Sequence, residues 1–359
     1  MNLRSGRKKV STRFLFAIAL VCLAASALVS LPRHVFATHD PICHEETLSV
    51  TLVPNSLTRY SIVGWLCSNG TLAGKTVQVL VSGGAYSHVY WDFPYQPDHY
   101  SYVRSSVQAG YAVFNFDRIG IGQSAHPLSA LVTVLSNASV VHQIVQALRR
   151  GQFEGVSFQK VIVVGHSLGS AISLYEAGQY PGDVNGVIIT GFLHTVNALE
   201  VPILAKDIHP AQLDPRFVDQ GYLPGYLTTR PGTRGQLFYS LPTTEAQVLA
   251  TDEATKATFT DAEASTFFPL VPAPLSRQIH VPVLLAEGKF DHFFCEGTVL
   301  VNCSDPRTVQ DYEAAFFSQD AHLQVQIIDQ AGHDLNLQEN APFWFEQAIS
   351  WADDAVGSK

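Results

Sequence analysis

A serine between two glycines is the first residue of this sequence that could do covalent chemistry. Ser167 is the centre of the pentapeptide GHSLG at 165–169, which matches the pattern G-x-S-x-G. In that pattern the serine lies on a sharp turn between a strand and a helix, and the glycines let the two backbones approach each other. The apolar run 160–164 precedes the motif and a helix-like run follows it. We predict that Ser167 is a nucleophile.

An acid and a histidine follow in the order that such a serine needs. A serine hydroxyl is a weak nucleophile at neutral pH, so a neutral imidazole must accept its proton and a carboxylate must orient that imidazole. The expected chain order is serine, acid, histidine. Asp291 follows an apolar run, and His333 follows the last one in the stretch QAGHD. We predict Asp291 as the orienting acid and His333 as the base, with Asp305 and Asp334 as alternative acids.

Acyl transfer also needs donors for the negative oxygen that develops on the substrate. Removal of one such donor costs about 3–4 kcal/mol of transition-state stabilisation. The amide of Leu168, directly after the nucleophile, is one expected donor. The other is expected from the loop at 82–85, which reads SGGA. We predict the amide of Gly84, with that of Ala85 as second choice, and the alternative is that the two glycines form only a turn.

Alternating strands and helices must bring these residues together. Residues 47–53 and 59–67 alternate as in a hairpin. Continuous apolar runs are typical of parallel strands covered on both faces, and they predict strands at 76–81, 111–116, 160–164, 187–190, 281–286 and 325–328. Apolar spacing predicts helices at 100–109, 131–150, from 171 onward and at 341–355. Sites in open α/β sheets form where strands end, which is where the three predicted catalytic residues stand.

One long segment interrupts this alternation. Residues 195–278 are rich in Pro, Thr and Ala and contain no strand of comparable strength. We predict a mostly helical cap over the site. The core, with a mostly parallel central sheet flanked by helices, is then made of residues 38–194 and 279–359.

Four features together resemble the α/β-hydrolase fold superfamily over about residues 47–355: the strand order, GHSLG, the loop Asp117-Arg118-x-Gly-x-Gly-x-Ser and the end AGHD. The run SGGAYSHVYWDFPY resembles secreted fungal members, whose loop usually starts His-Gly where this chain has Ser82. That change keeps the backbone donors but calls the side-chain hydrogen bonds of the loop into question. The resemblance implies a hydrolase or acyl transferase. Epoxide hydrolases and haloalkane dehalogenases are excluded, because they need a carboxylate in place of Ser167.

The first 37 residues differ in composition from the rest. A group of Lys and Arg residues precedes the apolar run 14–31, and the step 35–37 resembles a cleavage site. This pattern is typical of a secretory signal peptide. Because the run is about as long as the shortest membrane spans, an uncleaved signal anchor is the alternative. In both cases the rest of the chain is predicted to leave the cytosol.

Cysteine usage favours the same compartment. An even number of cysteines outside the leader suits two disulfides: Cys43, Cys67, Cys295 and Cys303. We predict the local pairing, the first with the second and the third with the fourth; the other two pairings and four free thiols are the alternatives. Their spacing with histidines does not fit a zinc site. Glycosylation sequons stand at Asn69, Asn137 and Asn302.

Charge narrows the range of partners. The formal net charge is −9 at pH 7, and no basic cluster occurs beyond the leader, which excludes a nucleic-acid partner.

We predict a secreted serine hydrolase that cleaves an ester-like bond of a small or medium apolar substrate, with no cofactor and no metal. The alternatives are a peptidase or acyl transferase with the same triad, for example in secondary-metabolite chemistry, and a non-catalytic binding protein. A membrane is a partner only if the leader stays as an anchor.

Overall fold

The apolar runs of the sequence form the strands of one eight-stranded sheet. The structure is a computed structural model that describes residue 2 and residues 40–272, 274–295 and 300–359. The strands lie in the order β1-β2-β4-β3-β5-β6-β10-β11. Their bounds are β1 Ile42–Val50, β2 Tyr60–Ser68, β3 Val77–Val81, β4 Ala112–Phe116, β5 Val161–His166, β6 Gly186–Thr190, β10 Val283–Gly288 and β11 Gln324–Ile328.

The sheet is mostly parallel, as predicted. From β4 to β11 every neighbouring pair is parallel, and only the hairpin β1–β2 and its contact with β4 are antiparallel. All residues of β3, β4, β5, β6 and β10 are buried. Strands that are covered on both faces need continuous apolar sequence, which explains why these runs do not alternate.

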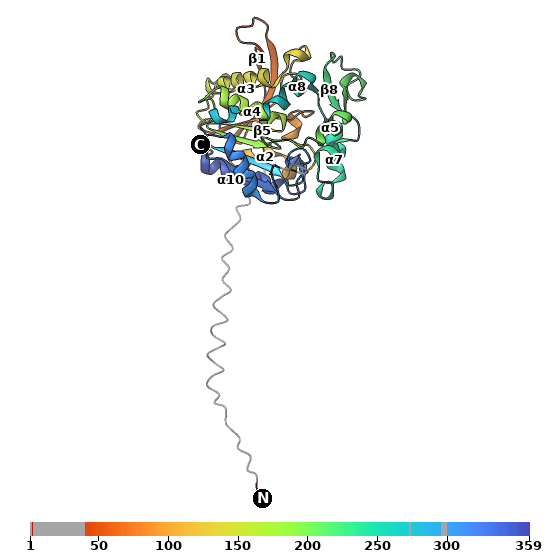
Figure 1. Cartoon of the computed structure of the whole chain (residues 1–359). Helices are drawn as coiled ribbons and strands as arrows, with labels where there is room; N and C mark the ends of the chain where they lie inside the picture. The colour runs from red at the N-terminus through yellow and green to blue at the C-terminus, as the bar shows by residue number, and fades with distance from the viewer. Residues whose placement is uncertain (1, 3–39, 273, 296–299) are drawn as a thin grey trace. The chain divides into compact units, whose positions relative to one another are not determined.

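Helices cover both faces of the sheet. Figure 1 shows α3 and α4 on one side of β5, and α2 and α10 on the other. A capping box in which Thr133 and Ser136 bond each other's backbone amides begins α3. The bounds are α1 Pro97–Tyr100, α2 Tyr102–Gln108, α3 Val134–Arg149, α4 Leu168–Gln179, α9 Pro306–Glu313 and α10 Ala341–Ala355.

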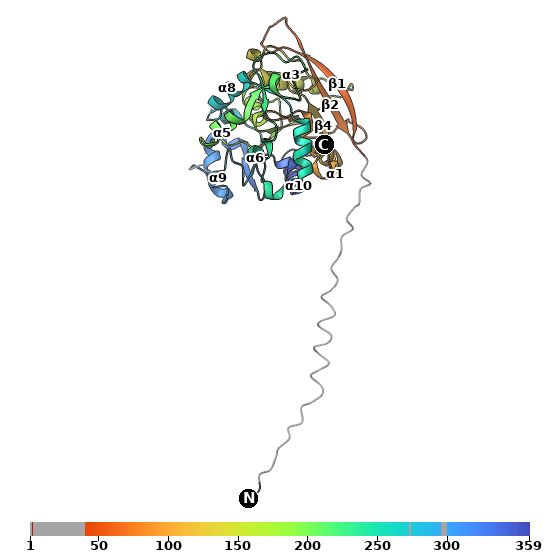
Figure 2. The ribbon, with the colours of Figure 1, turned by 90° about the vertical axis from the view of Figure 1, so that its right-hand side faces the viewer.

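The segment between β6 and β10 forms a separate group of elements. It lies at the right in Figure 1, on the side that faces the viewer in Figure 2. Its elements are α5 Glu200–Asp207, β7 Ile208–Pro210, β8 Tyr226–Thr229, α6 Arg234–Phe238, α7 Ala246–Thr255, β9 Phe259–Thr260 and α8 Asp261–Leu270. Helices are the larger part, but the three short strands pair into a small antiparallel sheet that periodicity did not predict. The limits of this segment at 195 and 278 stay a prediction.

Two disulfides have the local pairing that the sequence favours. Cys43 and Cys67 face each other across the hairpin β1–β2 and are joined. Cys295 and Cys303 are joined and close the loop that follows Asp291. Each bond therefore ties together chain that is already close in space.

The predicted leader at 1–37 lies outside the described residues, apart from residue 2. Among the residues that are described, none of the helices has the length and apolar character needed to cross a bilayer.

Candidate active site

Ser167 lies on the turn between β5 and α4. Its backbone has φ 54° and ψ −118°, a strained conformation for a residue with a side chain. The glycines beside it are needed for space: a Cβ on Gly165 would stand 2.5 Å from the carbonyl oxygen of Gly169, and one on Gly169 would stand 2.1 Å from that of Val81. The amide of Ser167 donates to the carbonyl oxygen of Thr190 at 2.8 Å. This is the strand–turn–helix context in which the motif exposes its hydroxyl.

Asp291 and His333 meet beyond the ends of β10 and β11. Nδ1 of His333 lies 2.6 Å from Oδ2 of Asp291. The other oxygen of the carboxylate, Oδ1, accepts hydrogen bonds from the amides of Phe293 at 2.7 Å and Phe294 at 3.3 Å. Both the acid and the histidine are buried. Asp291 thus holds the ring so that Nε2 of His333 is the nitrogen left for another partner.

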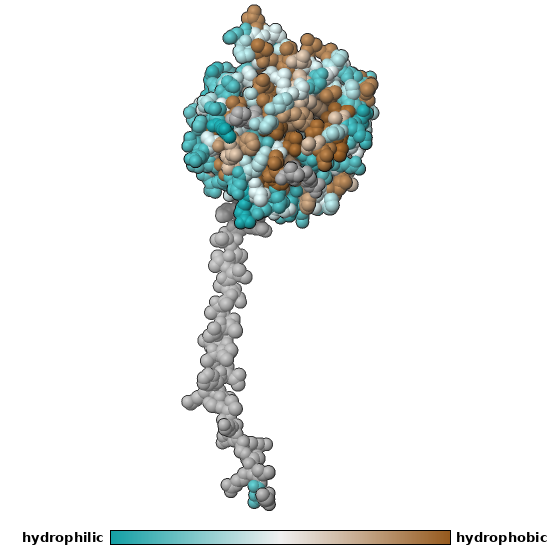
Figure 3. Space-filling model, in the orientation of Figure 1, coloured by the Kyte–Doolittle hydropathy of each residue, from teal (hydrophilic) through white to brown (hydrophobic). Residues whose placement is uncertain are grey.

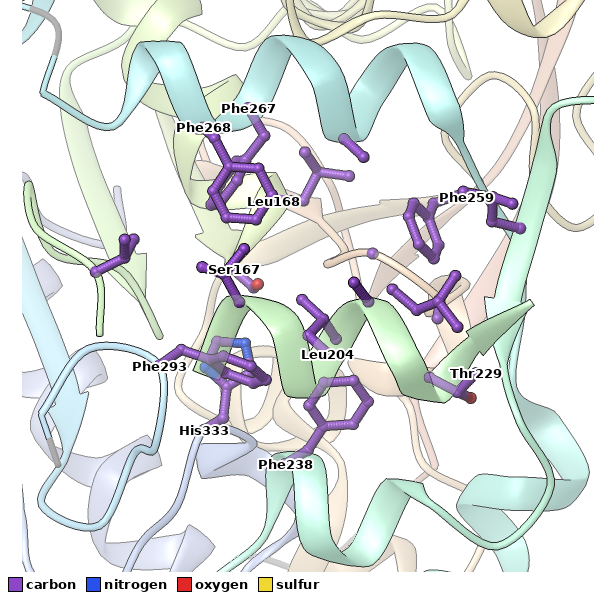
Figure 4. A pocket seen from close by; sticks show the side chains of 18 of the residues that line it. Ser167, Leu168, Leu204, Thr229, Phe238, Phe259, Phe267, Phe268, Phe293 and His333 are labelled. Carbon is purple, nitrogen blue, oxygen red and sulfur yellow. The ribbon is translucent and has the colours of Figure 1, made fainter. Parts of the chain in front are cut away.

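Ser167 and His333 line the same pocket, which has a volume of about 430 Å³. Figure 4 shows the serine hydroxyl and the imidazole on the same side of the pocket, where they face one another. The other lining is mainly apolar, and within the described residues no Asp, Glu, Lys or Arg lines it. The apolar lining comes from Ala85, Leu168, Val196, Val201, Leu204, Ala205, Ile208, Pro210, Leu227, Phe238, Phe259, Ala264, Phe267, Phe268, Phe293 and Phe294.

Most of that apolar lining belongs to the segment between β6 and β10. The helix α5 contributes Val201 and Leu204 to the pocket and leaves Ile203 exposed on its outer side. Figure 3 shows apolar surface gathered over this part of the molecule. The segment therefore supplies the walls of the pocket, while the core supplies Ser167, Asp291 and His333.

Burial and charge shift the pKa values of the two paired groups in opposite directions. Burial by itself lowers the pKa of His333, but the negative charge of Asp291 and their hydrogen bond outweigh burial, so the pKa lies above its ordinary value. Burial raises the pKa of Asp291, and the charge and hydrogen bond of His333 overcome that effect, so its pKa lies below the usual range. At neutral pH the acid is ionised and is matched to an imidazolium that forms during a reaction.

A second carboxyl, Glu287, lies behind Asp291 and was not predicted. It is fully buried in β10, its Oε1 accepts from the amide of Gly288 at 2.9 Å, and its carboxyl is hydrogen-bonded to that of Asp291. Burial and the charge of Asp291 raise the pKa of Glu287 well above its ordinary value. Both causes favour the protonated form of Glu287, which is the form that can donate a hydrogen bond to a carboxylate. An acid inside a fully buried apolar strand is the sequence signal that could have revealed it.

The two alternative acids do not bond His333. Oδ1 of Asp334 lies 3.0 Å from Nε2 of His166, and its other oxygen accepts a hydrogen bond from the hydroxyl of Tyr86. Asp305 caps α9 and pairs with Arg307. His166 is the centre of this second hydrogen-bonded group, because its Nδ1 lies 3.1 Å from the hydroxyl of Thr190.

The predicted oxyanion donors lie next to each other. A Cβ built on Gly84 would stand 3.7 Å from a side-chain carbon of Leu168, and both residues line the pocket. Within the described part of the chain, the amides of Gly84, Ala85 and Leu168 donate no hydrogen bond to the protein. Three unpaired N–H groups beside Ser167 are the arrangement that a developing negative oxygen requires.

The aromatic run 86–95 contributes mainly to the core. Tyr86 lines the pocket, but Tyr90, Trp91 and Phe93 are buried away from it. Tyr90 stacks on the ring of His166 with a centroid distance of 4.3 Å. Most of these aromatic side chains therefore serve packing, and Tyr86 also lines the pocket.

One group of side chains has ligand atoms close enough for a metal ion. His142, Glu176 and Asp183 lie within 4.8 Å of one another, away from the residues that line the pocket. His142 Nδ1 is already 2.5 Å from Asp183 Oδ2, and Gln146 donates to the other oxygen at 2.8 Å. Burial and the charge of Asp183 raise the pKa of Glu176 well above its ordinary value. Within this group, hydrogen bonds account for His142 and Asp183.

Comparison with known proteins supports the same architecture. No curated protein sequence matches this chain. It is similar in structure to a soluble variant of monoglyceride lipase from Saccharomyces cerevisiae (TM-score 0.58, 16% identity, 86% of this chain and 97% of that chain). It is also similar to a thermophilic esterase from Thermogutta terrifontis (0.55, 14%, 86% and 99%) and a bromoperoxidase from Bacillus anthracis (0.55, 17%, 86% and 100%).

At such identities the structural likeness shows the fold alone, and one fold hosts several activities. The narrower resemblance to secreted fungal proteins stays a prediction. A model of the alpha/beta hydrolase family, however, matches residues 78–347, which is most of the sequence. With the mostly parallel sheet and its flanking helices, this match shows that the chain belongs to the alpha/beta hydrolase family.

Proposed function

We propose that this enzyme is a serine ester hydrolase that acts through an acyl-enzyme on Ser167. The observation that carries the proposal is the placement of His333. Its Nδ1 is held by Asp291 at 2.6 Å, and its ring lines the same pocket as the strained Ser167. This combination of nucleophile, base and orienting acid is how an inert hydroxyl is activated at neutral pH.

In the proposed reaction, Nε2 of His333 accepts the proton of Ser167 while Oγ attacks the ester carbonyl. Asp291 stabilises the imidazolium that forms, and the amides of Gly84 and Leu168 hold the negative oxygen. His333 then gives the proton to the departing alcohol. A water molecule attacks the acyl-enzyme with the same histidine as base, which releases the acid and restores the serine.

The pocket favours an apolar acyl or alcohol group. Its volume of about 430 Å³ is within the usual range for sites that bind small molecules. Phenylalanines and leucines dominate the walls. Among the described residues that line the pocket there is no Asp, Glu, Lys or Arg that could bind a charged end of a peptide. The substrate is therefore proposed to be a small or medium apolar ester that enters with its carbonyl toward Ser167.

Labelling with a fluorophosphonate tests the nucleophile directly. We expect the purified enzyme to react at Ser167, and Ser167→Ala to lose both labelling and hydrolysis of p-nitrophenyl esters. The acyl-chain length that gives the highest kcat/KM reports how much of the pocket the substrate fills. Faster turnover of aminoacyl amides than of esters would favour a peptidase instead, and an unlabelled serine would favour a binding protein.

Secretion through the oxidising route is part of the same proposal. The two disulfides support it, because such bonds persist in oxidising compartments. Of the three sequons, Asn69 and Asn302 are the proposed glycan acceptors. Asn137 is buried and its amide donates to the carbonyl oxygen of Thr133 and to Glu263, both at 3.0 Å, so the folded chain leaves no room for a glycan there. Glycosidase treatment of protein from a secreting host, followed by mass spectrometry, tests these sites and the leader.

A further inference from the structure

Two buried arginines hold the carbonyl oxygens of the loop that carries Gly84. Arg118 donates from Nε to the carbonyl oxygen of Ser82 at 2.9 Å, and from Nη2 to that of Gly83 at 3.0 Å. Arg234 donates from Nη1 to the carbonyl oxygen of Ala85 at 3.4 Å. Both guanidinium groups are buried. Both arginines thus contact the loop on the side of its carbonyl groups, but at different peptide groups.

The contact of Arg118 with Gly83 acts on the predicted oxyanion donor. The carbonyl of Gly83 and the N–H of Gly84 belong to one peptide group, which is planar and trans, so they point in opposite directions. A donor that fixes the carbonyl on one side therefore aims the N–H at the other. Gly84 lines the pocket next to Leu168, so that other side is where the substrate oxygen would lie.

We propose that Arg118 is a positioning residue of the oxyanion site. It holds the peptide between Gly83 and Gly84 in one orientation and polarises it, so that its N–H binds the negative oxygen more strongly. The inference rests on the proposed esterase function and assigns a role to the Asp117-Arg118 motif. Among the described residues, no hydrogen bond joins the Asp117 carboxylate to the Gly83–Gly84 peptide. Its carboxylate accepts hydrogen bonds from the backbone amides of His88 at 3.0 Å and Gln123 at 2.8 Å.

Arg118 keeps its place through an ion pair with the segment that walls the pocket. Nη1 bonds Oε1 of Glu263, the third residue of α8, and both side chains are buried. Glu263 also accepts from the amide of Thr260 at 2.8 Å and from the side chain of Asn137 at 3.0 Å. A buried ion pair is by itself weak evidence for added stability. The proposed role of the ion pair with Glu263 is instead to hold Arg118 where it can bond the carbonyl oxygens of Ser82 and Gly83.

Arg234 supplies a matched control. It is equally buried and has its own carboxylate, since Nε and Nη2 each lie 2.7 Å from an oxygen of Asp252. It also bonds a carbonyl of the same loop. The carbonyl of Ala85, however, shares its peptide with the N–H of Tyr86, which is bonded to the carbonyl oxygen of Gly83 at 3.4 Å and is no oxyanion donor. Loss of Arg234 removes a similar buried ion pair without releasing the Gly83–Gly84 peptide.

The experiment compares two double variants, in which each carboxylate is neutralised together with its arginine so that no buried charge is left alone. We expect Arg118→Met with Glu263→Gln to lower kcat on a p-nitrophenyl ester by about 10- to 100-fold, with KM changed less than about threefold, because the lost interaction acts in the transition state. Arg234→Met with Asp252→Asn is expected to keep kcat within about threefold. Thermal unfolding shows whether the two double variants lose similar stability.

The outcomes separate the inference from the function on which it rests. Equal losses of kcat in both double variants would show a general structural effect and overturn the role of Arg118. An unchanged kcat with a raised KM in the Arg118 variant would do the same. If the fluorophosphonate fails to label the unaltered enzyme, both the function and the inference fall. If it labels Ser167 and the Arg118 double variant labels as fast, only the inference falls.

Discussion

Two histidine–carboxylate pairs lie side by side under the pocket, and they differ in what surrounds them. The pair His333–Asp291 has a separation of 2.6 Å and the pair His166–Asp334 one of 3.0 Å, and the two rings are 4.9 Å apart between centroids. His166 uses both nitrogens, because Nδ1 lies 3.1 Å from the hydroxyl of Thr190. Among the described residues, His333 bonds a partner only through Nδ1, and its ring lines the pocket.

The pKa values follow this difference. Burial and the neighbouring His333 lower the pKa of His166 well below its ordinary value, so it stays neutral, whereas the charge of Asp291 raises the pKa of His333. The same two residue types therefore make a structural pair in one place and a proposed catalytic pair in the other. A free nitrogen with access to substrate, rather than the presence of a carboxylate, distinguishes them.

Replacement of the two histidines should separate the pairs most strongly. We expect His333→Ala to lower kcat/KM by about 10⁴-fold or more, because the serine loses its base. His166→Ala should lower it by less than about tenfold. It should instead reduce the free energy of unfolding by about 2–4 kcal/mol, because Asp334 is left buried without its partner. Ester kinetics and urea unfolding measure the two effects, and a reversed order would contradict the assignment of roles.

Replacement of the acids tests the same distinction with smaller changes of shape. Asp291→Asn should lower kcat by about 10³- to 10⁴-fold, since an amide neither fixes the needed tautomer nor balances the imidazolium. Asp334→Asn can still bond His166 and Tyr86, so we expect kcat within about threefold of the unaltered enzyme. Steady-state kinetics on one ester suffice, and comparable losses in both variants would show that the two pairs work as one unit.

The pair His166–Asp334 should also affect how the free energy of unfolding depends on pH. Burial raises the pKa of Asp334 from 3.8 to about 6 against the opposing charges of His333 and Arg234. Between these pH values the folded state binds more protons than the unfolded state, so this group's contribution to stability falls as pH rises from 4 to 6.5, by up to about 3 kcal/mol. Urea unfolding of the unaltered protein and Asp334→Asn at several pH values measures the difference. If the free energy of unfolding of the unaltered protein minus that of Asp334→Asn rose as pH increases from 4 to 6.5, this sign would be contradicted.

The smallest expected effect concerns Glu287. Activity requires neutral His333, so the raised pKa of His333 places the acidic limb of kcat/KM above pH 6.5, with activity rising as pH rises. If Glu287 is protonated, Glu287→Gln removes no charge and should leave that limb within about 0.3 pH units. Glu287→Leu removes the hydrogen bond to Asp291, which makes the acid more basic and should move the limb upward. A downward shift in the glutamine variant would show that Glu287 is ionised.

Much of the architecture could be predicted because it follows from short-range patterns. The continuous apolar runs predicted the parallel strands, and the predicted last helix has the same bounds as α10. The short strands β7, β8 and β9 were missed, because each has at most four residues and is stabilised by its neighbours rather than by its own sequence. The aromatic run 86–95 has no period that distinguishes core packing from pocket lining.

The sequence by itself determined the residue types and their order along the chain: a serine in a glycine-flanked turn, then an acid and a histidine after later strands. Only the tertiary structure decided the partners. It joined His333 to Asp291 rather than to the adjacent Asp334, placed Glu287 behind the acid, and put Arg118 behind Gly83. The physical reason is that burial, hydrogen bonds and pKa values depend on contacts between residues far apart in sequence, and such contacts exist only in the folded chain.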